Sequence, residues 1–302
     1  MPAGPASSDR GRVLVTGSNG FTGRYLTAQL TAWGYTVVEH TEAQCDLRDP
    51  QAMRDWVQSV QPSYAIHLAA ITFVPHGSPA EIYEVNTVGS THLLDALSDN
   101  RLAIKKVILA SSSQVYGYAP REPIDESAPC QPMNHYACSK LAMEYMAATY
   151  RRRLPIVITR PFNYTGPGQS ERFVVPKIVG HYARREKRIE LGNLDVVRDF
   201  SDVQMVADVY CRLLEAPVAG ETLNICSGVG RSLRWLVDEC ARLSGHRLEL
   251  VVRPDLVRSV DPERLVGSNA RLLEAIGVLR HDDFRATLQA MIEAAEAVRP
   301  AI

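Results

Sequence analysis

A glycine-rich turn that joins an apolar run to an amphipathic segment constrains this chain more than any other feature. Residues 12–16 read as a buried strand of a parallel sheet, and the strand stops at Gly17. Gly20 and Gly23 complete the turn, and the amphipathic segment that follows ends at Gly34. The apolar residues of that segment share one helical face: Leu26, Leu30 and Trp33. Strand, glycine turn and helix in this order predict a dinucleotide-binding βα unit.

The three glycines have separate physical roles in such a unit. Gly17 permits the tight turn, Gly20 lets the backbone approach a pyrophosphate, and Gly23 lets the helix pack closely on the strand. The spacing is GxxGxxG rather than GxGxxG, and an ordinary glycine-rich turn is the alternative interpretation. We predict that a cofactor contacts the turn through Gly17, Asn19, Gly20, Phe21, Thr22 and Gly23.

The end of the second predicted strand, residues 35–39, bears on the choice between NAD and NADP. An acidic residue there binds the adenosine ribose, whereas an arginine accepts a 2′-phosphate. Thr41 occupies the expected acid position, Glu39 and Glu42 flank it, and the next basic residue is Arg48. Because two carboxylates repel a 2′-phosphate, we predict NAD(P)H as the cofactor, with a preference for NADH.

Two further strands end in residues that are small or polar enough to face a cofactor. Residues 64–68 run into Ala69 and Ala70, whose small side chains let a cofactor lie across the strand end. Residues 106–110 run into the serine-rich segment 111–117. Because ligands of open parallel sheets bind at the carboxyl ends of the strands, this segment is predicted to face the cofactor crevice.

A tyrosine and a lysine four residues apart mark the start of a later helix. Tyr136 and Lys140 project from one face of a helix that opens at Asn134. A neighbouring ammonium favours the phenolate, which makes Tyr136 a candidate proton donor and acceptor for a carbonyl/alcohol pair. Such a pair also arises by chance on many helices, so its weight comes from the glycine turn and the serine-rich segment that precede it.

These three motifs, in this order, resemble the extended short-chain dehydrogenase/reductase family of nucleotide-sugar epimerases, dehydratases and reductases. The likeness runs from about residue 12 to about residue 284. It implies an enzyme with an α/β fold, a Rossmann-like doubly wound parallel sheet with a smaller C-terminal substrate-binding lobe. The family's catalytic serine or threonine aligns with Ser112, and its catalytic tyrosine and lysine align with Tyr136 and Lys140.

The remaining predicted cofactor contacts come from four places along the chain. They are Asp46 and Leu47 after the second strand, Leu68, Ala69 and Ala70 at the end of the third, Tyr136 and Lys140, and Pro161. For the domains, we predict a flexible tail over 1–11, a dinucleotide-binding domain over 12–162 and a substrate-binding lobe over 163–302. A segment near 203–226 is predicted to return to the sheet domain.

Several segments of the second half resemble enzymes that act on GDP-sugars. The resemblance implies that Asn163 contacts the sugar and that Lys177, Arg198 and Arg258 contact the diphosphate and nucleoside. It further implies that Asp261 binds a ribose hydroxyl. Arginine forks suit a diphosphate because they bind it in bidentate fashion. One departure is Ser259, where the family usually has a proline.

The residues after the fourth strand separate the possible reactions. The family's 4,6-dehydratases carry a carboxylic residue where this chain has Gln114, beside Ser113; we place both in the substrate site. An amide cannot donate a catalytic proton at neutral pH, so dehydration is disfavoured. The resemblance then implies NAD(P)H-dependent reduction of the C4 ketone of a GDP-4-keto-6-deoxyhexose to a GDP-6-deoxyhexose, GDP-D-rhamnose.

Two alternatives to this reductase remain open. A nucleotide-sugar 4-epimerase with tightly bound NAD uses the same Ser-Tyr-Lys set but shows no net consumption of NAD(P)H. A non-enzymatic dinucleotide-binding regulatory protein has no need of Ser112, Tyr136 and Lys140 together, so the intact set argues against it.

Two predicted helices bear on oligomeric state. The apolar faces of residues 80–97 and 136–150 could form the four-helix homodimer interface that family members use, or could simply pack on the sheet. We predict the homodimer. Asn86, within the first of these helices, is interpreted as a solvated residue, with a role in the site as the alternative.

Composition excludes several classes of partner. The 33 Lys and Arg against 34 Asp and Glu give a net charge of −1, so nothing draws the chain to nucleic acid. No run approaches the roughly 18 apolar residues that a membrane span needs. The six cysteines show no metal-ligand spacing, which predicts free thiols, no metal and a cytoplasmic protein: Cys45, Cys130, Cys138, Cys211, Cys226 and Cys240.

Overall fold

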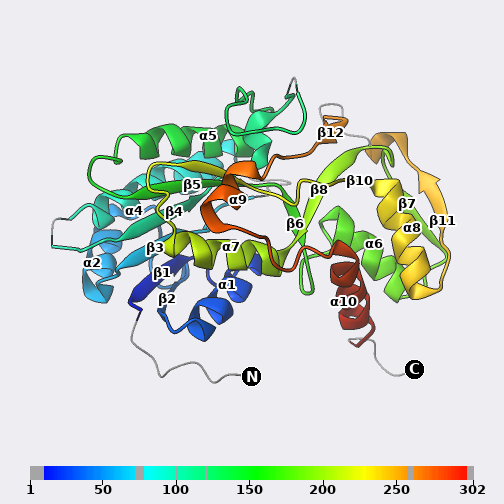
Figure 1. The fold of residues 1–302 in the computed structure, drawn as a ribbon, viewed down its shortest axis with the longest axis horizontal. Helices are drawn as coiled ribbons and strands as arrows, with labels where there is room; N and C mark the ends of the chain where they lie inside the picture. Colours follow the sequence, from blue (N-terminus) through cyan, green and yellow to red (C-terminus); the bar gives the residue numbers. More distant parts are fainter. Residues whose placement is uncertain (1–9, 73–77, 100, 120, 257–261, 298–302) are drawn as a thin grey trace. The chain divides into compact units, whose positions relative to one another are not determined.

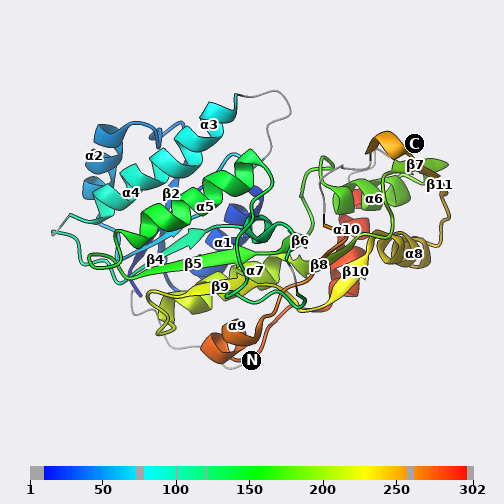
Figure 2. The same cartoon turned by 90° about the horizontal axis from the view of Figure 1, so that it is seen from above.

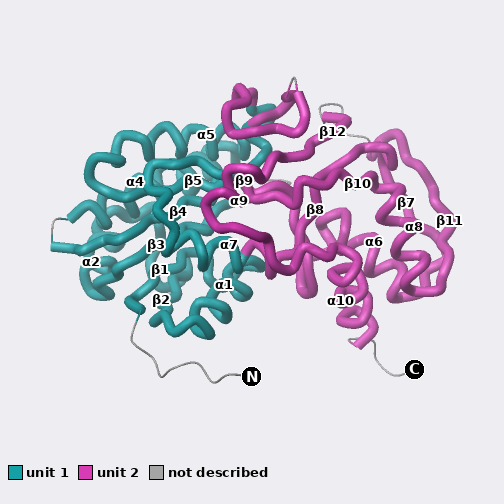
Figure 3. Tube along the Cα trace, in the orientation of Figure 1, with its two compact units in different colours: residues 1–115, 132–160, 207–223 teal, residues 116–131, 161–206, 224–302 magenta. Residues whose placement is uncertain are grey.

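The structure is a computed structural model that describes residues 10–72, 78–99, 101–119, 121–256 and 262–297 (Figure 1). The chain forms two compact units, which are coloured separately in Figure 3. Unit 1 comprises residues 1–115, 132–160 and 207–223, and unit 2 comprises residues 116–131, 161–206 and 224–302.

A six-stranded sheet forms the framework of unit 1. Its strands are β1 (Arg12–Thr16), β2 (Thr36–His40), β3 (Tyr64–His67), β4 (Lys106–Ala110), β5 (Ile156–Pro161) and β9 (Thr222–Ile225). They are ordered β2-β1-β3-β4-β5-β9. The pairs β1–β2, β1–β3, β3–β4 and β4–β5 are all parallel, and Val13 stands in register with Val37 on one side and Tyr64 on the other.

The strand order reverses at β1. The chain passes from β1 to β2 on one side and then returns to place β3, β4 and β5 on the other. In an open parallel sheet, a ligand binds at the carboxyl ends of the strands at such a reversal. The predicted Rossmann-like doubly wound sheet is therefore confirmed, and its switch point lies where β1 and β3 end.

Helices cover this sheet. They are α1 (Phe21–Ala32), α2 (Pro50–Val60), α3 (Pro79–Tyr83), α4 (Ser90–Leu97), α5 (His135–Ala148) and α7 (Val203–Glu215). In Figure 2, α4 and α5 run side by side. One core cluster joins strands to helices through residues such as Leu14, Val57, Leu93, Leu109, Met143 and Ile158. Asp49 and Asn134 cap the N-termini of α2 and α5 with their side chains.

The helix predicted over 80–97 is not regular. Six residues, Glu84–Gly89, form a π-helical turn between α3 and α4, which we call the π turn. A π turn holds one residue more than an α-helical turn and so changes which side chains point inward. The apolar spacing of the sequence does not reveal this irregularity.

Unit 2 is built from short strands and four α-helices in its described residues, three of which pack together. The strands are β6 (Asn163–Thr165), β7 (Arg188–Leu191), β8 (Val197–Asp202), β10 (Gly230–Ser232), β11 (Glu249–Val252) and β12 (Arg264–Leu265). β8 pairs with β10, β12 and β6, and β7 pairs with β11. The helices are α6 (Val174–Ala183), α8 (Leu233–Ser244), α9 (Ala270–Ile276) and α10 (Phe284–Ala297). α6, α8 and α10 enclose a second core that includes Ile178, Phe200, Leu236 and Leu288.

None of the helices in the described part of the chain has the length and apolar character needed to cross a membrane. Nor does this part contain three or more His, Cys, Asp or Glu side chains grouped so that they could hold a metal ion. All six cysteines are free thiols.

Candidate active site

The glycine turn after β1 is shaped by close backbone contacts. Gly17 adopts a left-handed φ of +70°, and a Cβ there would lie 2.9 Å from the backbone nitrogen of Ala69, just after β3. A Cβ at Gly23 would lie 2.3 Å from the carbonyl oxygen of Gly17. Side chains are therefore excluded at both positions, and the ends of β1 and β3 meet. α1 begins at Phe21 without a side-chain cap, so its N-terminus suits a phosphate.

A buried asparagine anchors the segment that follows β3. The Asn86 side chain accepts from the Ile71 N–H at 2.8 Å and donates to the Ile71 carbonyl at 3.0 Å. It also donates to the Ser139 hydroxyl on α5 at 3.0 Å. Asn86 is fully buried, so the interpretation of a solvated residue is wrong. This side chain fixes the backbone next to Ala69 and Ala70 and links it to α5.

The π turn aims Asn86 inward, and its last residue is packed tightly. A Cβ at Gly89 would lie 2.9 Å from the Cβ of Leu47, a predicted cofactor contact that is itself buried. On α4, the ring Nδ1 of His92 lies 2.9 Å from the Leu47 carbonyl oxygen. The helix that carries Asn86 therefore also supports the segment after β2. The apolar pattern of the sequence contains no signal for this contact.

The end of β2 shows how the predicted ribose site is charged. Arg48 forms ion pairs with Asp46 at 2.6 Å and with Glu42 at 3.5 Å. The Arg48 guanidinium holds the pKa of the Asp46 carboxyl below its usual range. Thr41 donates through its N–H to the Gln44 side chain at 2.8 Å. The first basic residue after β2 is thus already bound by two carboxylates.

Lys140 is a deeply buried titratable group of unit 1. It is 2% exposed, and its Nζ donates to the carbonyl oxygen of Ala110, the last residue of β4, at 2.8 Å. Burial lowers the pKa of Lys140 to about 8, while the charge of Glu144 acts in the opposite direction. Tyr136 lies one helical turn earlier on α5 and is half-buried. Lys140 can therefore exchange a proton near neutral pH.

The predicted catalytic serine lies in the turn that leaves β4. Ser112 is 8% exposed, and its hydroxyl oxygen accepts from the Gln114 N–H at 3.2 Å. A 3₁₀ helix spans Ser113–Tyr116, in which Ser113 is buried and Gln114 is exposed. The Gln114 side-chain oxygen accepts from the amide of Asn134, the cap of α5, at 3.1 Å. The Ser112 turn and the start of α5 are therefore hydrogen-bonded together.

A buried ion pair lies under this turn, and sequence reasoning did not find it. Arg160, near the end of β5, donates from Nε and Nη2 to Glu144 at 3.0 and 2.6 Å. Ser111 donates from its hydroxyl to the same carboxylate at 2.5 Å. Glu144 follows Lys140 by four residues on α5, a spacing that places the two side chains on one face of the helix but does not point to Arg160.

Apart from Ser113 and Gln114, the predicted substrate residues belong to unit 2. Asn163 begins β6 and donates to the Asp199 carbonyl at 3.4 Å, while Lys177 on α6 donates to the Glu190 carbonyl at 2.8 Å. Arg198 on β8 donates to the Val197 carbonyl at 2.8 Å. Pro161, a predicted cofactor contact, ends β5 at the boundary of the unit. Arg258 and Asp261 lie outside the described residues.

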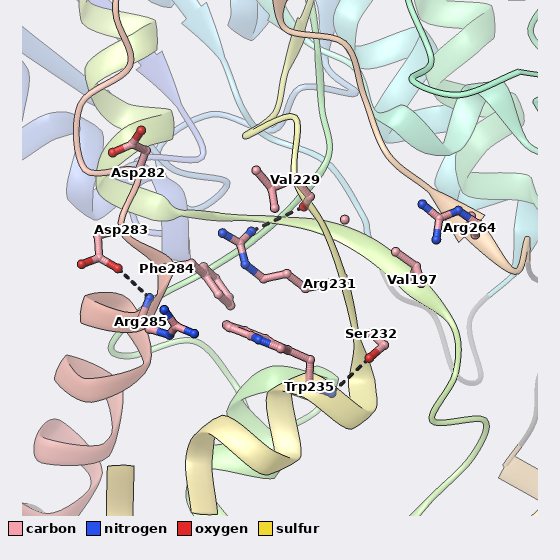
Figure 4. A pocket seen from close by; sticks show the side chains of 11 residues that line it. Val197, Val229, Arg231, Ser232, Trp235, Arg264, Asp282, Asp283, Phe284 and Arg285 are labelled. Atoms are coloured by element: carbon pink, nitrogen blue, oxygen red, sulfur yellow. Dashed lines mark hydrogen bonds between the residues drawn. The ribbon is translucent and has the colours of Figure 1, made fainter. Parts of the chain in front are cut away.

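A cavity within unit 2 adds a further arginine near Arg198. Figure 4 shows the Arg231 guanidinium beside the rings of Phe284 and Trp235, at 5.1 and 5.4 Å from their centroids. Arg231 is the register partner of Arg198 across β10 and β8, and such partners share one face of a sheet. The cavity measures about 520 Å³, and its other charged lining residues are Arg264, Asp282, Asp283 and Arg285. The sequence analysis did not include Arg231.

A glycine turn at the switch point of a parallel sheet, followed by a helix with Tyr136 and Lys140, defines a dinucleotide-dependent oxidoreductase of the short-chain type. Comparison with known proteins agrees. The profile of the NAD dependent epimerase/dehydratase family matches residues 13–226. The chain belongs to this family, which confirms the resemblance seen in the sequence.

Two relatives and one solved structure show what this chain is similar to within the family. The chain is 35% identical to GDP-6-deoxy-D-talose 4-dehydrogenase of Aggregatibacter actinomycetemcomitans, covering 93% of this chain and 96% of the relative. It is 35% identical to GDP-6-deoxy-D-mannose reductase of Pseudomonas aeruginosa, with the same coverage. The structure of RMD from Pseudomonas aeruginosa complexed with NADPH matches with a TM-score of 0.86 at 33% identity, over 95% of this chain and 98% of that one.

Proposed function

We propose that this protein is an NAD(P)H-dependent reductase that converts the C4 ketone of a GDP-4-keto-6-deoxyhexose into the alcohol of a GDP-6-deoxyhexose. The observation that carries the proposal is the pairing of Tyr136 and the buried Lys140 on α5, next to the Ser112 turn at the carboxyl end of β4. The relatives named for reactions of GDP-6-deoxyhexoses support the choice of substrate.

The residues of unit 1 fit a dinucleotide. Gly17 and Gly23 leave no room for a side chain, so the turn presents only backbone at the switch point. The start of α1 has no side-chain cap and offers the positive end of the helix to a pyrophosphate. Leu68, Ala69 and Ala70 would hold the adjoining part of the cofactor beside β3. A reduced nicotinamide, when bound, supplies the hydride for the ketone carbon.

The protein's own part of the reaction is to deliver a proton. The Tyr136 hydroxyl gives its proton to the ketone oxygen while the ketone carbon gains a hydride. The two together reduce the carbonyl group to an alcohol. Ser112 donates a hydrogen bond to the same oxygen and stabilises its developing negative charge. A charged Lys140 favours the Tyr136 phenolate that remains after proton transfer. Gln114 can bind the sugar, but its amide supplies no acid for dehydration.

In unit 2, we propose that Lys177 and Arg198 bind the diphosphate and that Asn163 binds the sugar. Arg231 extends this proposal, because it is the register partner of Arg198 and its guanidinium lies over the Trp235 ring, 5.4 Å from the centroid. Guanidinium groups on aromatic rings keep their N–H edges available for phosphate oxygens. Arg258 and Asp261 remain proposed contacts of the nucleoside on the resemblance alone.

For the cofactor, we propose a preference for NADH over NADPH. The support is the carboxylate of Glu42, with Glu39 nearby in sequence, and the engagement of Arg48 by Asp46 and Glu42. A 2′-phosphate would have to compete with these carboxylates for Arg48. The Pseudomonas aeruginosa structure contains NADPH, so a direct comparison of the two cofactors is needed.

We also propose a homodimer built from the helices of residues 79–97 and 135–148. Tyr145 on α5 is 70% exposed and Val88 in the π turn is 46% exposed, so two elements that contact each other both present apolar surface. Light scattering on the purified protein measures the oligomeric state. A dimer that Tyr145→Lys converts to a monomer supports this interface, whereas a monomeric wild type rejects it.

The deciding experiment combines the purified protein with GDP-4-keto-6-deoxymannose, generated in situ, and with NADH or NADPH in separate reactions. We expect stoichiometric loss of reduced nicotinamide absorbance, faster with NADH. Proton coupling constants of the sugar in the product distinguish rhamnose from talose configuration at C4; we expect GDP-D-rhamnose. The family also contains epimerases, so interconversion of GDP- or UDP-hexoses without net cofactor consumption would replace the reductase with a 4-epimerase.

A further inference from the structure

The carboxylate of Glu144 is held by three hydrogen bonds in the interior of unit 1. The Arg160 guanidinium provides two of them and the Ser111 hydroxyl provides the third. The side chains of Glu144 and Arg160 are only 7% and 8% exposed. A buried ion pair is weak evidence for a gain in stability, because desolvation offsets the attraction. The arrangement therefore calls for a role other than stability.

The position of Ser111 suggests that role. Ser111 lies between Ala110, whose carbonyl accepts from Lys140, and Ser112, the proposed catalytic serine. Two consecutive residues at the end of β4 are thus hydrogen-bonded to α5: Ala110 to Lys140, and Ser111 to Glu144. Loss of either hydrogen bond would allow the Ser112 turn to shift relative to the helix that carries Tyr136.

Glu144 also contributes charge next to the buried lysine. It stands one helical turn after Lys140, and its negative charge favours the protonated lysine while burial opposes it. His67 on β3 interacts with Lys140 as well; burial lowers the pKa of this histidine to about 3, so it is neutral at working pH. Arg160 on β5 offsets part of the Glu144 charge, and Tyr136 lies one helical turn before Lys140 on α5.

We propose that Glu144, held by Arg160 and Ser111, is a positioning residue that locks the Ser112 turn onto α5 and keeps Lys140 in its charged form. Its effect on turnover rests on the proposed function. Its effect on Lys140 does not, so the two can be tested apart.

The first test follows Lys140 directly by NMR. The chain has only five lysines, Lys105, Lys106, Lys140, Lys177 and Lys187, so lysine labelled with ¹³C at Cε gives a spectrum simple enough to titrate. Lys140→Arg identifies the Lys140 signal by its disappearance. We expect Glu144→Gln to lower the titration midpoint of Lys140 by about one pH unit.

The matched control is Glu239→Gln. Glu239 on α8 of unit 2 has the same 7% side-chain exposure and pairs with Arg242 at 2.5 Å, so it also loses an ion pair on substitution. It should leave the Lys140 midpoint unchanged. Because Glu144→Gln removes half of a buried pair and can lower stability, the double variant Glu144→Gln/Arg160→Met, which removes both charges, is titrated alongside.

The second test addresses the Ser112 turn. Ser111→Ala removes the hydroxyl link and keeps the ion pair; we expect kcat to fall on the order of tenfold with KM values changed less than about twofold. Its control is Ser201→Ala, a 3% exposed serine whose hydroxyl has no hydrogen-bond partner among the described residues.

The outcomes separate the explanations. An unmoved Lys140 midpoint in folded Glu144→Gln and in the double variant overturns the charge role, and equal kcat for Ser111→Ala and Ser201→Ala overturns the positioning role. If the wild-type protein oxidises no NAD(P)H with the GDP-keto-sugar, the proposed function fails, yet the NMR titration still decides whether Glu144 controls Lys140.

Discussion

Two lysines make the same hydrogen bond in different settings. Lys140 of unit 1 and Lys177 of unit 2 each donate from Nζ to a backbone carbonyl at 2.8 Å. Lys140 is buried at the end of the sheet with Glu144 one turn away, whereas Lys177 is half-buried on α6 beside β7. Burial makes the charge of Lys140 adjustable, while partial exposure leaves the Lys177 ammonium group within reach of a phosphate. Unit 1 should therefore govern turnover, and unit 2 should govern binding.

The largest effect should come from the proton donor of unit 1. Tyr136→Phe removes the hydroxyl and keeps the ring, so kcat should fall by about 10²–10⁴-fold while NAD(P)H still binds. Steady-state kinetics and a nicotinamide fluorescence titration measure the two quantities. Tyr118→Phe, at a tyrosine that is 50% exposed in unit 2, is the control and should retain wild-type kcat. Comparable kcat values for the two variants would remove Tyr136 from the mechanism.

The adjustable charge of Lys140 should appear in stability as a function of pH. Its pKa is about 8 in the folded protein against 10.5 when exposed, so between these values the unfolded chain binds more protons and stability rises with pH. The contribution is about 3 kcal/mol over this window, from 1.36 kcal/mol per unit. Urea unfolding at several pH values should show this rise in wild type but a smaller one in Lys140→Met. An equal rise of the unfolding free energy with pH in both proteins would contradict a pKa of Lys140 lowered by burial.

The glycine turn offers a comparison between two left-handed glycines. Gly17 and Gly34 have φ values of +70° and +83°, but a Cβ at Gly34 meets nothing within 4 Å. Gly34→Ala should cost about 1–2 kcal/mol of unfolding free energy from conformation alone. Gly17→Ala should cost about 1–3 kcal/mol more, because its Cβ meets Ala69, and it should also weaken NAD(P)H binding. Equal losses in the two variants would mean that the Gly17 contact is relaxed at little cost.

The smallest effect should come from unit 2. Lys177→Met removes one charge from the proposed diphosphate site, so KM for the GDP-sugar should rise about tenfold with kcat nearly unchanged. Lys187→Met, at an exposed lysine just beyond α6, is the matched control and should leave KM unaltered. A fall in kcat at constant KM would show that Lys177 supports the chemistry instead, and the contrast between the two units would fail.

What could be predicted from the sequence was mostly local. The β1–turn–α1 unit and the spacing of Tyr136 and Lys140 are local patterns of neighbouring residues, so the fold and the family could be predicted from them. Asn86 and Ser139 lie 53 positions apart, and their hydrogen bond depends on a π turn that the apolar spacing does not reveal. Arg160 and Glu144 are joined only once the sheet brings β5 beneath α5. Long-range pairing of this kind has no signature in a single sequence.

The π turn makes the helix between residues 79 and 97 sensitive to length. A π turn holds one residue more than an α-helical turn, so removing one residue from it would restore regular winding, keep α3 and α4 in phase and disturb mainly the inward position of Asn86. Removing one residue from α4 has no such compensation, because an α-helix rotates by about 100° for each residue and Leu93 or Leu94 would turn out of the core. Substitutions at most surface positions of this helix should be tolerated, whereas a one-residue deletion within α4 should lower the free energy of unfolding more than a one-residue deletion within the π turn.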